Sequence, residues 1–181
     1  MIYPIVVYGS PILRNENKEI DREYPEVGKL IEDMFETMYA ADGVGLAAPQ
    51  IGRNIRVFVV DISPWGDSEP ELAGFRKAFI NPDIYWRSDD ETLFCEGCLS
   101  LPNLNEDVSR PSTIKMRWLD ENFQEHDAEF DGRAARVIQH EYDHLEGILF
   151  SDKLSPLRRT LIKGKLTNFT KGKYSASYRT K

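Results

Sequence analysis

The sequence is poor in cysteine and histidine, and it has no long hydrophobic run. Its 181 residues include two cysteines and three histidines. Two cysteines are too few for a disulfide framework, so we expect reduced thiols in a cytoplasmic protein. Residues 1–14 have no basic segment ahead of their short apolar stretch, and they therefore predict neither a signal peptide nor a transit peptide. Because no apolar run approaches membrane-spanning length, we expect no membrane partner.

Acidic residues are absent from the carboxyl-terminal part of the chain. Residues 153–181 contain nine Lys or Arg and no Asp or Glu, whereas residues 1–152 hold 14 basic and all 30 acidic residues. The net charge of −7 therefore divides into −16 and +9. A basic segment of this kind can bind an anionic partner such as RNA phosphates. We favour a simpler prediction, a solvated helix face followed by a frayed terminus at 171–181.

Two of the three histidines stand in the run HEYDH at residues 140–144. On a helix, His140 and His144 lie one turn apart and project from one face, where both can bind the same metal ion. The carboxylate of Glu141 is then placed to move a proton to or from a water beside the metal. The remaining histidine, His126, is expected to be an exposed strand residue.

A third protein ligand has to come from before this run. After His144 the chain contains no His or Cys, and its only acids are Glu146 and Asp152. HExxH peptidases usually take their third ligand well downstream, so that arrangement is not open to this chain. Cys98 is the leading candidate, and it offers a thiolate to the same ion.

The run CEGC at 95–98 also fits two other kinds of site. It matches a redox pair, or it supplies both cysteines of a closed Cys2His2 zinc site with His140 and His144. The redox alternative is disfavoured because residues 99–102 look extended rather than helical. A fourth side chain would close the coordination sphere, whereas Glu141 favours a site with one position left open for water or substrate.

Helical periodicity predicts three helices. Apolar residues at helical spacing predict a long amphipathic helix over 25–41. Asp131 is the expected N-cap of a second helix that runs to Leu145 and carries the metal ligands on its core-facing side. Ser155 is the expected N-cap of a last helix that begins at Pro156. The apolar stripe of this last helix is expected to consist of Leu157, Leu161 and Ile162.

Strand signals lie between the first and second helices. Glycine-bearing or polar loops are expected at 42–52 and 64–74. The expected strands are 55–62, an interrupted strand at 79–82 and 84–86, and a hairpin of 112–119 with 122–130. We therefore expect an α+β fold with mixed or antiparallel strands around a central metal-binding helix. At 41% hydrophobic content, residues 1–181 are expected to form a single domain, with a basic helix and tail at 153–181.

With these residues placed, the chain resembles the bacterial peptide deformylases, which remove the formyl group from the amino end of new proteins. Three separated segments carry the resemblance, and PILR at 11–14 adds to it. These segments are GVGLAAPQIG at 43–52, EGCLSLP at 96–102 and QHEYDHLEG at 139–147. Their order and spacing agree with the family, and three motifs in register are far more specific than HExxH alone.

The resemblance implies a metal-dependent hydrolase acting on N-formylmethionyl peptides. Cys98, His140 and His144 would hold one divalent ion, iron(II) in the physiological form, with zinc, nickel or cobalt as substitutes. Glu141 would take a proton from the attacking water and pass it to the departing amine.

The resemblance also implies how the substrate is held. The side-chain amide of Gln50 and the backbone N–H of Leu99 would donate hydrogen bonds to the oxygen of the formyl group. Gly45 and Gly97 would let the substrate backbone approach closely. The methionine side chain would enter an apolar pocket. The expected walls of this pocket are Val44, Phe94 and Val137.

Some features lie outside the family pattern or match it only loosely. Cys95 is not a family requirement, and Arg133 and Arg136 stand where many relatives are apolar. Arg110 matches a family arginine with a structural pairing role. The basic carboxyl-terminal helix implies a weak contact with the ribosome, and we expect no DNA partner. The competing hypotheses are a metallopeptidase with the same motif and a zinc-stapled interaction domain.

Overall fold

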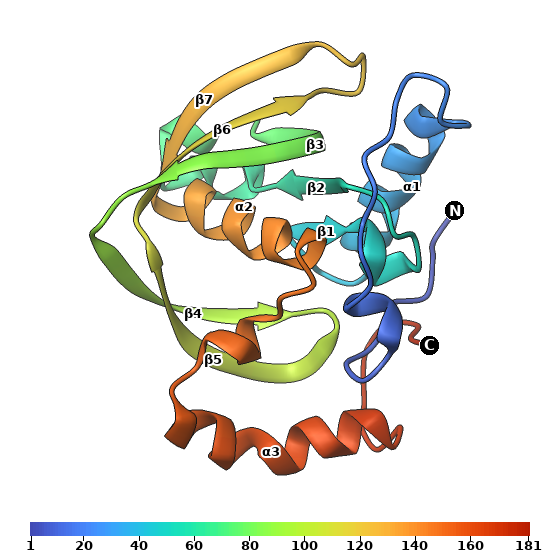
Figure 1. Ribbon diagram of the computed structural model, residues 1–181, viewed down its shortest axis with the longest axis vertical. Coiled ribbons are helices and arrows are strands. Elements are labelled where there is room, and N and C mark those ends of the chain that lie inside the picture. The colour runs from blue at the N-terminus through green and yellow to red at the C-terminus, as the bar shows by residue number, and fades with distance from the viewer.

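The protein has the expected α+β fold, with three α-helices and seven strands (Figure 1). The computed structural model describes residues 1–181. The α-helices are α1 (Val27–Ala40), α2 (Gly132–Leu145) and α3 (Pro156–Thr170), which confirms the three predicted helices. Five short 3-10 helices join the longer elements: η1 (Pro11–Leu13), η2 (Ala48–Ile51), η3 (Ser63–Asp67), η4 (Pro70–Leu72) and η5 (Phe150–Lys153).

The strands form two separate antiparallel sheets. The larger sheet has the order β1-β2-β3-β6-β7, and the smaller one is the hairpin β4-β5. The strand bounds are β1 (Gly45–Ala47), β2 (Val57–Asp61), β3 (Arg76–Arg87), β4 (Glu91–Cys98), β5 (Leu101–Pro111), β6 (Thr113–Leu119) and β7 (Glu125–Asp131). The predicted strand at 55–62 and the hairpin at 112–130 are confirmed.

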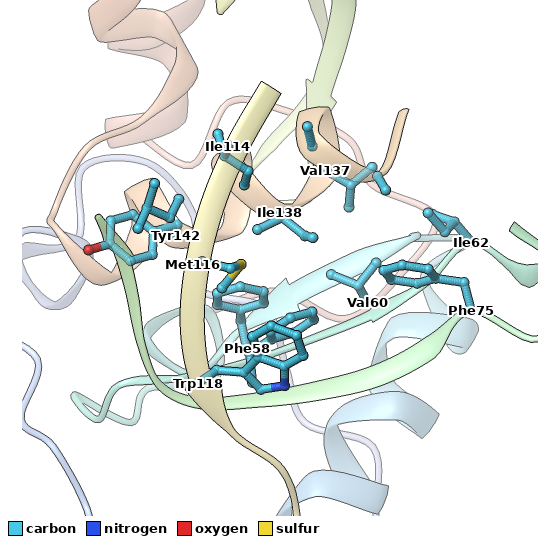
Figure 2. Close-up of a cluster of buried hydrophobic side chains, with 14 of the residues drawn as sticks. Phe58, Val60, Ile62, Phe75, Ile114, Met116, Trp118, Val137, Ile138 and Tyr142 are labelled. Atoms are coloured by element: carbon cyan, nitrogen blue, oxygen red, sulfur yellow. The ribbon is translucent and has the colours of Figure 1, made fainter. Parts of the chain in front are cut away.

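Helix α2 lies between the larger sheet and the β4-β5 hairpin (Figure 1). Its apolar side packs against β2 and β6, where Ile138 meets Phe58 and Met116 in one buried cluster (Figure 2). Helix α1 covers another part of the same sheet, and α3 packs beyond β5. Because one side of α2 is used by the apolar core, its opposite side is left to face the hairpin.

Both ends of α2 lie at the predicted positions. Asp131 occupies the N-cap position, but its side chain makes no capping hydrogen bond. Gly147, just past the carboxyl end, adopts a φ of 71°, a left-handed conformation that glycine takes without steric cost. The helix therefore ends where the sequence predicts.

Several strand predictions need refinement. The interrupted strand is one element, β3, whose register with β6 shifts between Ile80 and Asp83. Pro82 lies at this irregularity, and it has no backbone N–H to donate to a neighbouring strand. The predicted loop at 42–52 contains β1 and η2. The β4-β5 hairpin was not predicted beyond an extended stretch at 99–102.

The predicted apolar stripe of α3 is largely wrong. Leu157 and Leu161 are 68% and 62% exposed, whereas Ile162 is buried. The buried side of α3 consists of Ile162 and Phe169, which pack with Leu104 of β5. Helix α3 turns a different face to the core because it packs on β5, and the position of β5 is set by contacts between residues far apart in the sequence. No helix combines the length and the apolar composition needed to cross a membrane.

The prediction of a frayed terminus at 171–181 is also wrong. The end of the chain runs beside the amino-terminal segment, with a parallel bridge between Ile5 and Thr180. The backbone N–H of Ile5 donates to the Arg179 carbonyl at 2.8 Å, and that of Lys181 donates to the Ile5 carbonyl at 2.9 Å. These main-chain hydrogen bonds hold the tail although its side chains are mostly polar.

Candidate metal centre and active-site cleft

The structure brings the three predicted ligands together. Cys98 ends β4, while His140 and His144 lie one turn apart on α2, and their donor atoms all lie within 4.8 Å of one another. Cys98 Sγ is 3.4 Å from His144 Nε2. In a tetrahedral zinc centre, metal–sulfur and metal–nitrogen bonds of about 2.3 and 2.0 Å set these two atoms roughly 3.5 Å apart. The donor set therefore fits a single metal ion.

The surroundings orient His140 and keep His144 neutral. His140 Nδ1 lies 2.8 Å from Glu96 Oε1, which leaves Nε2 free to face the centre. Burial, and then the neighbouring His140, hold the pKa of His144 well below its ordinary value. His144 is therefore neutral near pH 7 and keeps a lone pair for a metal.

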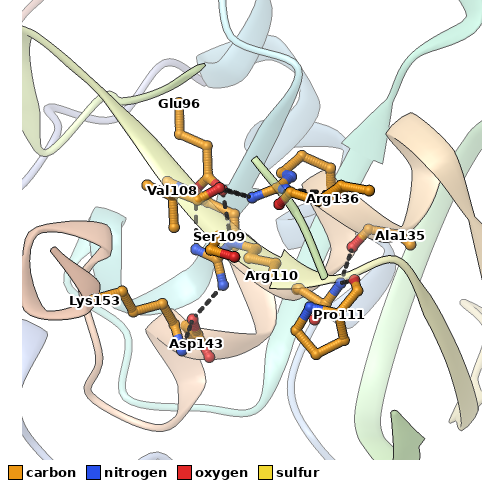
Figure 3. A network of polar contacts seen from close by, with 12 residues as sticks. Glu96, Val108, Ser109, Arg110, Pro111, Ala135, Arg136, Asp143 and Lys153 are labelled. Atoms are coloured by element: carbon orange, nitrogen blue, oxygen red, sulfur yellow. Dashed lines mark hydrogen bonds and ion pairs between the residues drawn. The ribbon is translucent and has the colours of Figure 1, made fainter. Parts of the chain in front are cut away.

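The Glu96 carboxylate that contacts His140 belongs to a buried ionic network, whose other members are shown in Figure 3. Glu96 accepts hydrogen bonds from Arg110 at 2.6 and 2.9 Å and from Arg136 at 2.7 Å. Arg110 also donates to Asp143 at 2.6 Å. Although burial alone would raise the pKa of Glu96, the hydrogen bonds from His140 and Arg110 hold it well below its usual range. Glu96 is thus a carboxylate that orients His140, and the expected pairing role of Arg110 is present.

Glu141 lines the same cavity as the ligands Cys98 and His140. Its side chain is 4% exposed, and Oε2 has no hydrogen-bond partner. Burial raises the pKa of Glu141 to about 7. A carboxylate with this pKa exchanges a proton readily near neutral pH.

Gly45 makes room for this carboxylate. A Cβ at Gly45 would lie 2.5 Å from Glu141 Oε1, and one at Gly97 would lie 2.6 Å from the Asn105 side chain. The two glycines therefore accommodate side chains of the protein itself. Their expected role in the approach of the substrate backbone stays a prediction.

Gln50 is fixed with its amide nitrogen toward the centre. The backbone N–H of Ala47 donates to Gln50 Oε1 at 2.9 Å, so Nε2 points the other way. Gln50 Nε2 lies 3.1 Å from Ser100 Oγ and 3.7 Å from Cys98 Sγ. The backbone N–H of Leu99 has no acceptor within the protein. Two donors, one from a side chain and one from the main chain, thus border the same cavity.

The predicted pocket residues also come together. Val44, Phe94 and Val137 line a hollow of about 200 Å³ beside the main cavity of about 370 Å³. His140 and Glu141 border both spaces. The other walls of the smaller hollow include Trp65 and Arg136 but not Arg133, which pairs with Glu69.

Cys95 does not belong to the centre. Its side chain is exposed, and the cluster of possible metal ligands contains only Cys98, His140 and His144. No fourth protein ligand closes the site, which removes the support for a Cys2His2 centre. The alternative of a redox pair is disfavoured as well, because β4 leads into a strand rather than a helix.

Sequence reasoning missed two parts of this site. Glu96 stands in a recognised motif, but no role was predicted for its carboxylate. Tyr178 lines the main cavity with its neighbours Ala176 and Ser177, and it was expected to lie in a frayed tail. The available signal was the pair of aromatic residues, Tyr174 and Tyr178, in an otherwise polar segment.

Comparisons with known proteins agree with this geometry. Residues 2–160 match the family model described as polypeptide deformylase. Over 186 residues the chain is 50% identical to a peptide deformylase of Christiangramia forsetii, covering 99% of this chain and 95% of the relative. A second relative, from Cytophaga hutchinsonii, is 51% identical over 181 residues, with coverage of 100% and 97%.

Solved structures show the same fold. Arabidopsis thaliana peptide deformylase 1B, in complex with an inhibitor, aligns with a TM-score of 0.83 at 35% identity, covering 93% of this chain and 91% of that one. The peptide deformylase of Thermotoga maritima aligns with a TM-score of 0.78 at 39% identity, covering 86% and 99%.

Proposed function

The chain belongs to the polypeptide deformylase family, and from that premise we propose the part that each residue of the site plays. Members of this family are hydrolases that remove the formyl group from the N-terminal formylmethionine of nascent polypeptides and release formate. The chain is accordingly an enzyme that acts on N-formylmethionyl peptides, and its cluster of one thiolate and two imidazoles fits a metal site.

Cys98, His140 and His144 would hold the metal ion. A thiolate with two imidazoles suits iron(II), zinc, nickel or cobalt, and we take iron(II), the ion that the family resemblance implies, as the ion used in the cell. Such an ion, when bound, acts as a Lewis acid and lowers the pKa of water. The convergence of these three donor atoms within 4.8 Å, beside the unpaired carboxylate of Glu141, is the observation that carries the proposal.

Glu141 is the proton carrier. It takes a proton from the water that attacks the formyl carbon, and it delivers that proton to the nitrogen that leaves. Its pKa of about 7 suits both steps, since the group has to accept a proton and then release it. Burial in the cleft keeps this carboxylate away from bulk water.

Gln50 and Leu99 stabilise the negative charge that develops on the formyl oxygen. Gln50 Nε2 and the free Leu99 N–H border one cavity, which supports a shared target. Loss of a single such donor typically costs about 3 kcal/mol of transition-state stabilisation. The methionine side chain would occupy the smaller hollow, against Val44, Phe94 and Val137.

The remaining proposals concern the whole chain. Residues 1–181 would act as one domain, because α3 packs with β5 in a shared buried cluster. The exposed basic side of α3 supports a weak contact with ribosomal RNA, although Arg158 is already paired with Glu106 at 2.7 Å. We place the enzyme in the cytoplasm, where nascent chains emerge.

The test is formate release from formyl-Met-Ala-Ser by reduced protein loaded with iron(II) or nickel(II). Glu141→Ala should keep its metal and lose roughly 10²- to 10⁴-fold in turnover, because the proton carrier is gone. Glu146→Ala is the control, since this acid caps the carboxyl end of the same helix and pairs with Arg56 instead. Cleavage within the peptide would favour a metallopeptidase. If the protein releases no formate and its bound metal is inaccessible to small ligands, the result would favour a zinc-stapled interaction domain.

A further inference from the structure

The carboxyl-terminal segment Tyr174–Lys181 forms one wall of the active-site cavity. Ala176, Ser177 and Tyr178 line that cavity together with Cys98 and Leu99. The segment is held in place by main-chain hydrogen bonds to Ile5 and Val7, and Figure 1 shows the end of the chain running close to the amino-terminal segment. The side chain of Asn103 adds a hydrogen bond of 2.9 Å to the Ser175 carbonyl. The wall is therefore a built part of the fold.

Tyr178 makes the side-chain hydrogen bond that joins this wall to the turn after Cys98. Its hydroxyl donates to the Leu99 carbonyl at 2.7 Å. Burial, and then the nearby Cys98, raise the pKa of Tyr178 to about 12, so the phenol keeps its proton at neutral pH. The hydrogen bond spans 79 positions in the sequence and joins the tail directly to the residue that carries the free N–H.

The turn that bears Leu99 is short and is held at few points. Leu99 and Ser100 connect Cys98 to its strand partner Leu101. The Ser100 carbonyl accepts from the backbone N–H of Tyr8 at 2.8 Å, and Ser100 Oγ accepts from Gln50 at 3.1 Å. The Leu99 residue itself has one hydrogen bond, the one from Tyr178. Rotation of the Leu99 backbone is thus restrained on its carbonyl side by this hydroxyl.

We propose that Tyr178 is a positioning residue for deformylation, which fixes the Leu99 carbonyl and thereby aims the Leu99 N–H at the formyl oxygen. This inference rests on the proposed role of Leu99 as a donor. Catalysis by such donors depends on their alignment before the reaction starts. A small displacement of an aligned group lowers the rate without removing the group itself.

The experiment compares Tyr178→Phe with Tyr174→Phe in the full-length, metal-loaded enzyme. Each variant loses one phenol hydroxyl from the same tail, and Tyr174 bonds to Thr180 Oγ1 at 2.9 Å rather than to the turn. Because displacement of an aligned donor costs less than its removal, Tyr178→Phe should lower kcat per bound metal by about tenfold. We expect KM for formyl-Met-Ala-Ser, metal content and Tm to stay near wild type, and Tyr174→Phe to keep wild-type kcat.

A second readout tests the positioning without any turnover. In zinc-loaded protein, ¹⁵N relaxation should give the Leu99 amide an order parameter near the rigid-backbone value of about 0.85 in wild type, and a lower value in Tyr178→Phe. Equal kcat per bound metal in the two variants, or an unchanged Leu99 order parameter, would overturn the inference. If wild-type protein releases no formate, the proposed function fails, while the relaxation data still report on the role of Tyr178.

Discussion

Replacing Glu96 by Gln should disturb both the fold and the metal centre. The carboxylate is 6% exposed and accepts hydrogen bonds from Arg110, Arg136 and His140. A glutamine of the same shape turns one acceptor oxygen into an NH2 donor that faces other donors. It also removes the negative charge that compensates two buried guanidinium groups. Arg110 would keep Asp143 as a partner at 2.6 Å, and Arg136 would keep the carbonyls of two residues on the hairpin.

The expected loss of stability in Glu96→Gln follows from these remaining contacts. Breaking a buried ion pair by removing one partner costs about 3–5 kcal/mol, and the surviving contacts of both arginines favour the lower end, about 3 kcal/mol. Loss of the group that orients a metal-binding histidine typically weakens metal binding by about 10- to 100-fold. The variant should therefore lose stability in the metal-free state, and it should lose metal affinity in addition.

Glu106→Gln is the matched control. Glu106 lies directly opposite Glu96 on β5 and is also buried, but its partner Arg158 is 50% exposed. An ion pair with an exposed partner contributes about 0–1 kcal/mol. Urea unfolding of reduced, metal-free protein measures the loss of unfolding free energy, and competition with a chromophoric chelator measures the metal affinity. Equal stability losses in the two variants, or an unchanged metal affinity in Glu96→Gln, would refute the reasoning.

Three further predictions follow from single contacts. Cys98→Ser should weaken zinc or nickel binding strongly in a chelator titration, whereas Cys95→Ser should not, and equal losses would favour a four-ligand centre. Ile162→Ala should cost about 2–5 kcal/mol in denaturant unfolding, against about 0.5 kcal/mol or less for the exposed Leu161→Ala. Although burial opposes it, an arginine partner lowers the pKa of Asp152, so its contribution is present above the unfolded pKa. The stability gap between wild type and Asp152→Asn should thus close as the pH falls below about 4. A gap that does not narrow at all as the pH falls below about 4 would contradict that pairing.

The metal helix was predictable because its signals are local. His140 and His144 stand one turn apart, and the apolar positions that point to the sheet keep the same helical period. The β4-β5 hairpin was not predictable in this way. Its inward positions include Glu96, Glu106 and Arg110, and buried charges erase the alternation that marks a half-buried strand. These charges stay buried only because partners from distant segments neutralise them. A short stretch of sequence around each strand does not contain those partners.

The same limit explains the tail and the last helix. The nine positive charges of residues 153–181 correctly suggest solvated side chains, but a charge pattern carries no information about where the backbone runs. The tail is held by main-chain hydrogen bonds to Ile5 and Val7, which any sequence without proline at the donor positions can form. Helix α3 likewise offers two apolar faces, and the choice of Ile162 over Leu161 is made by β5.

The site draws its parts from both layers of the fold, and this arrangement ties metal binding to stability. Cys98 belongs to the hairpin, whereas His140 and His144 belong to the helix that packs on the larger sheet. In the metal-free protein these two layers are joined near the site by the charged network of Glu96, Arg110 and Arg136. A ligand that binds only the native state adds about 4 kcal/mol to unfolding at 1,000 times its Kd. Metal at saturating concentration should therefore compensate for much of the damage in Glu96→Gln, and a metal-loaded variant that stays as weak as its metal-free form would contradict this coupling of metal binding to stability.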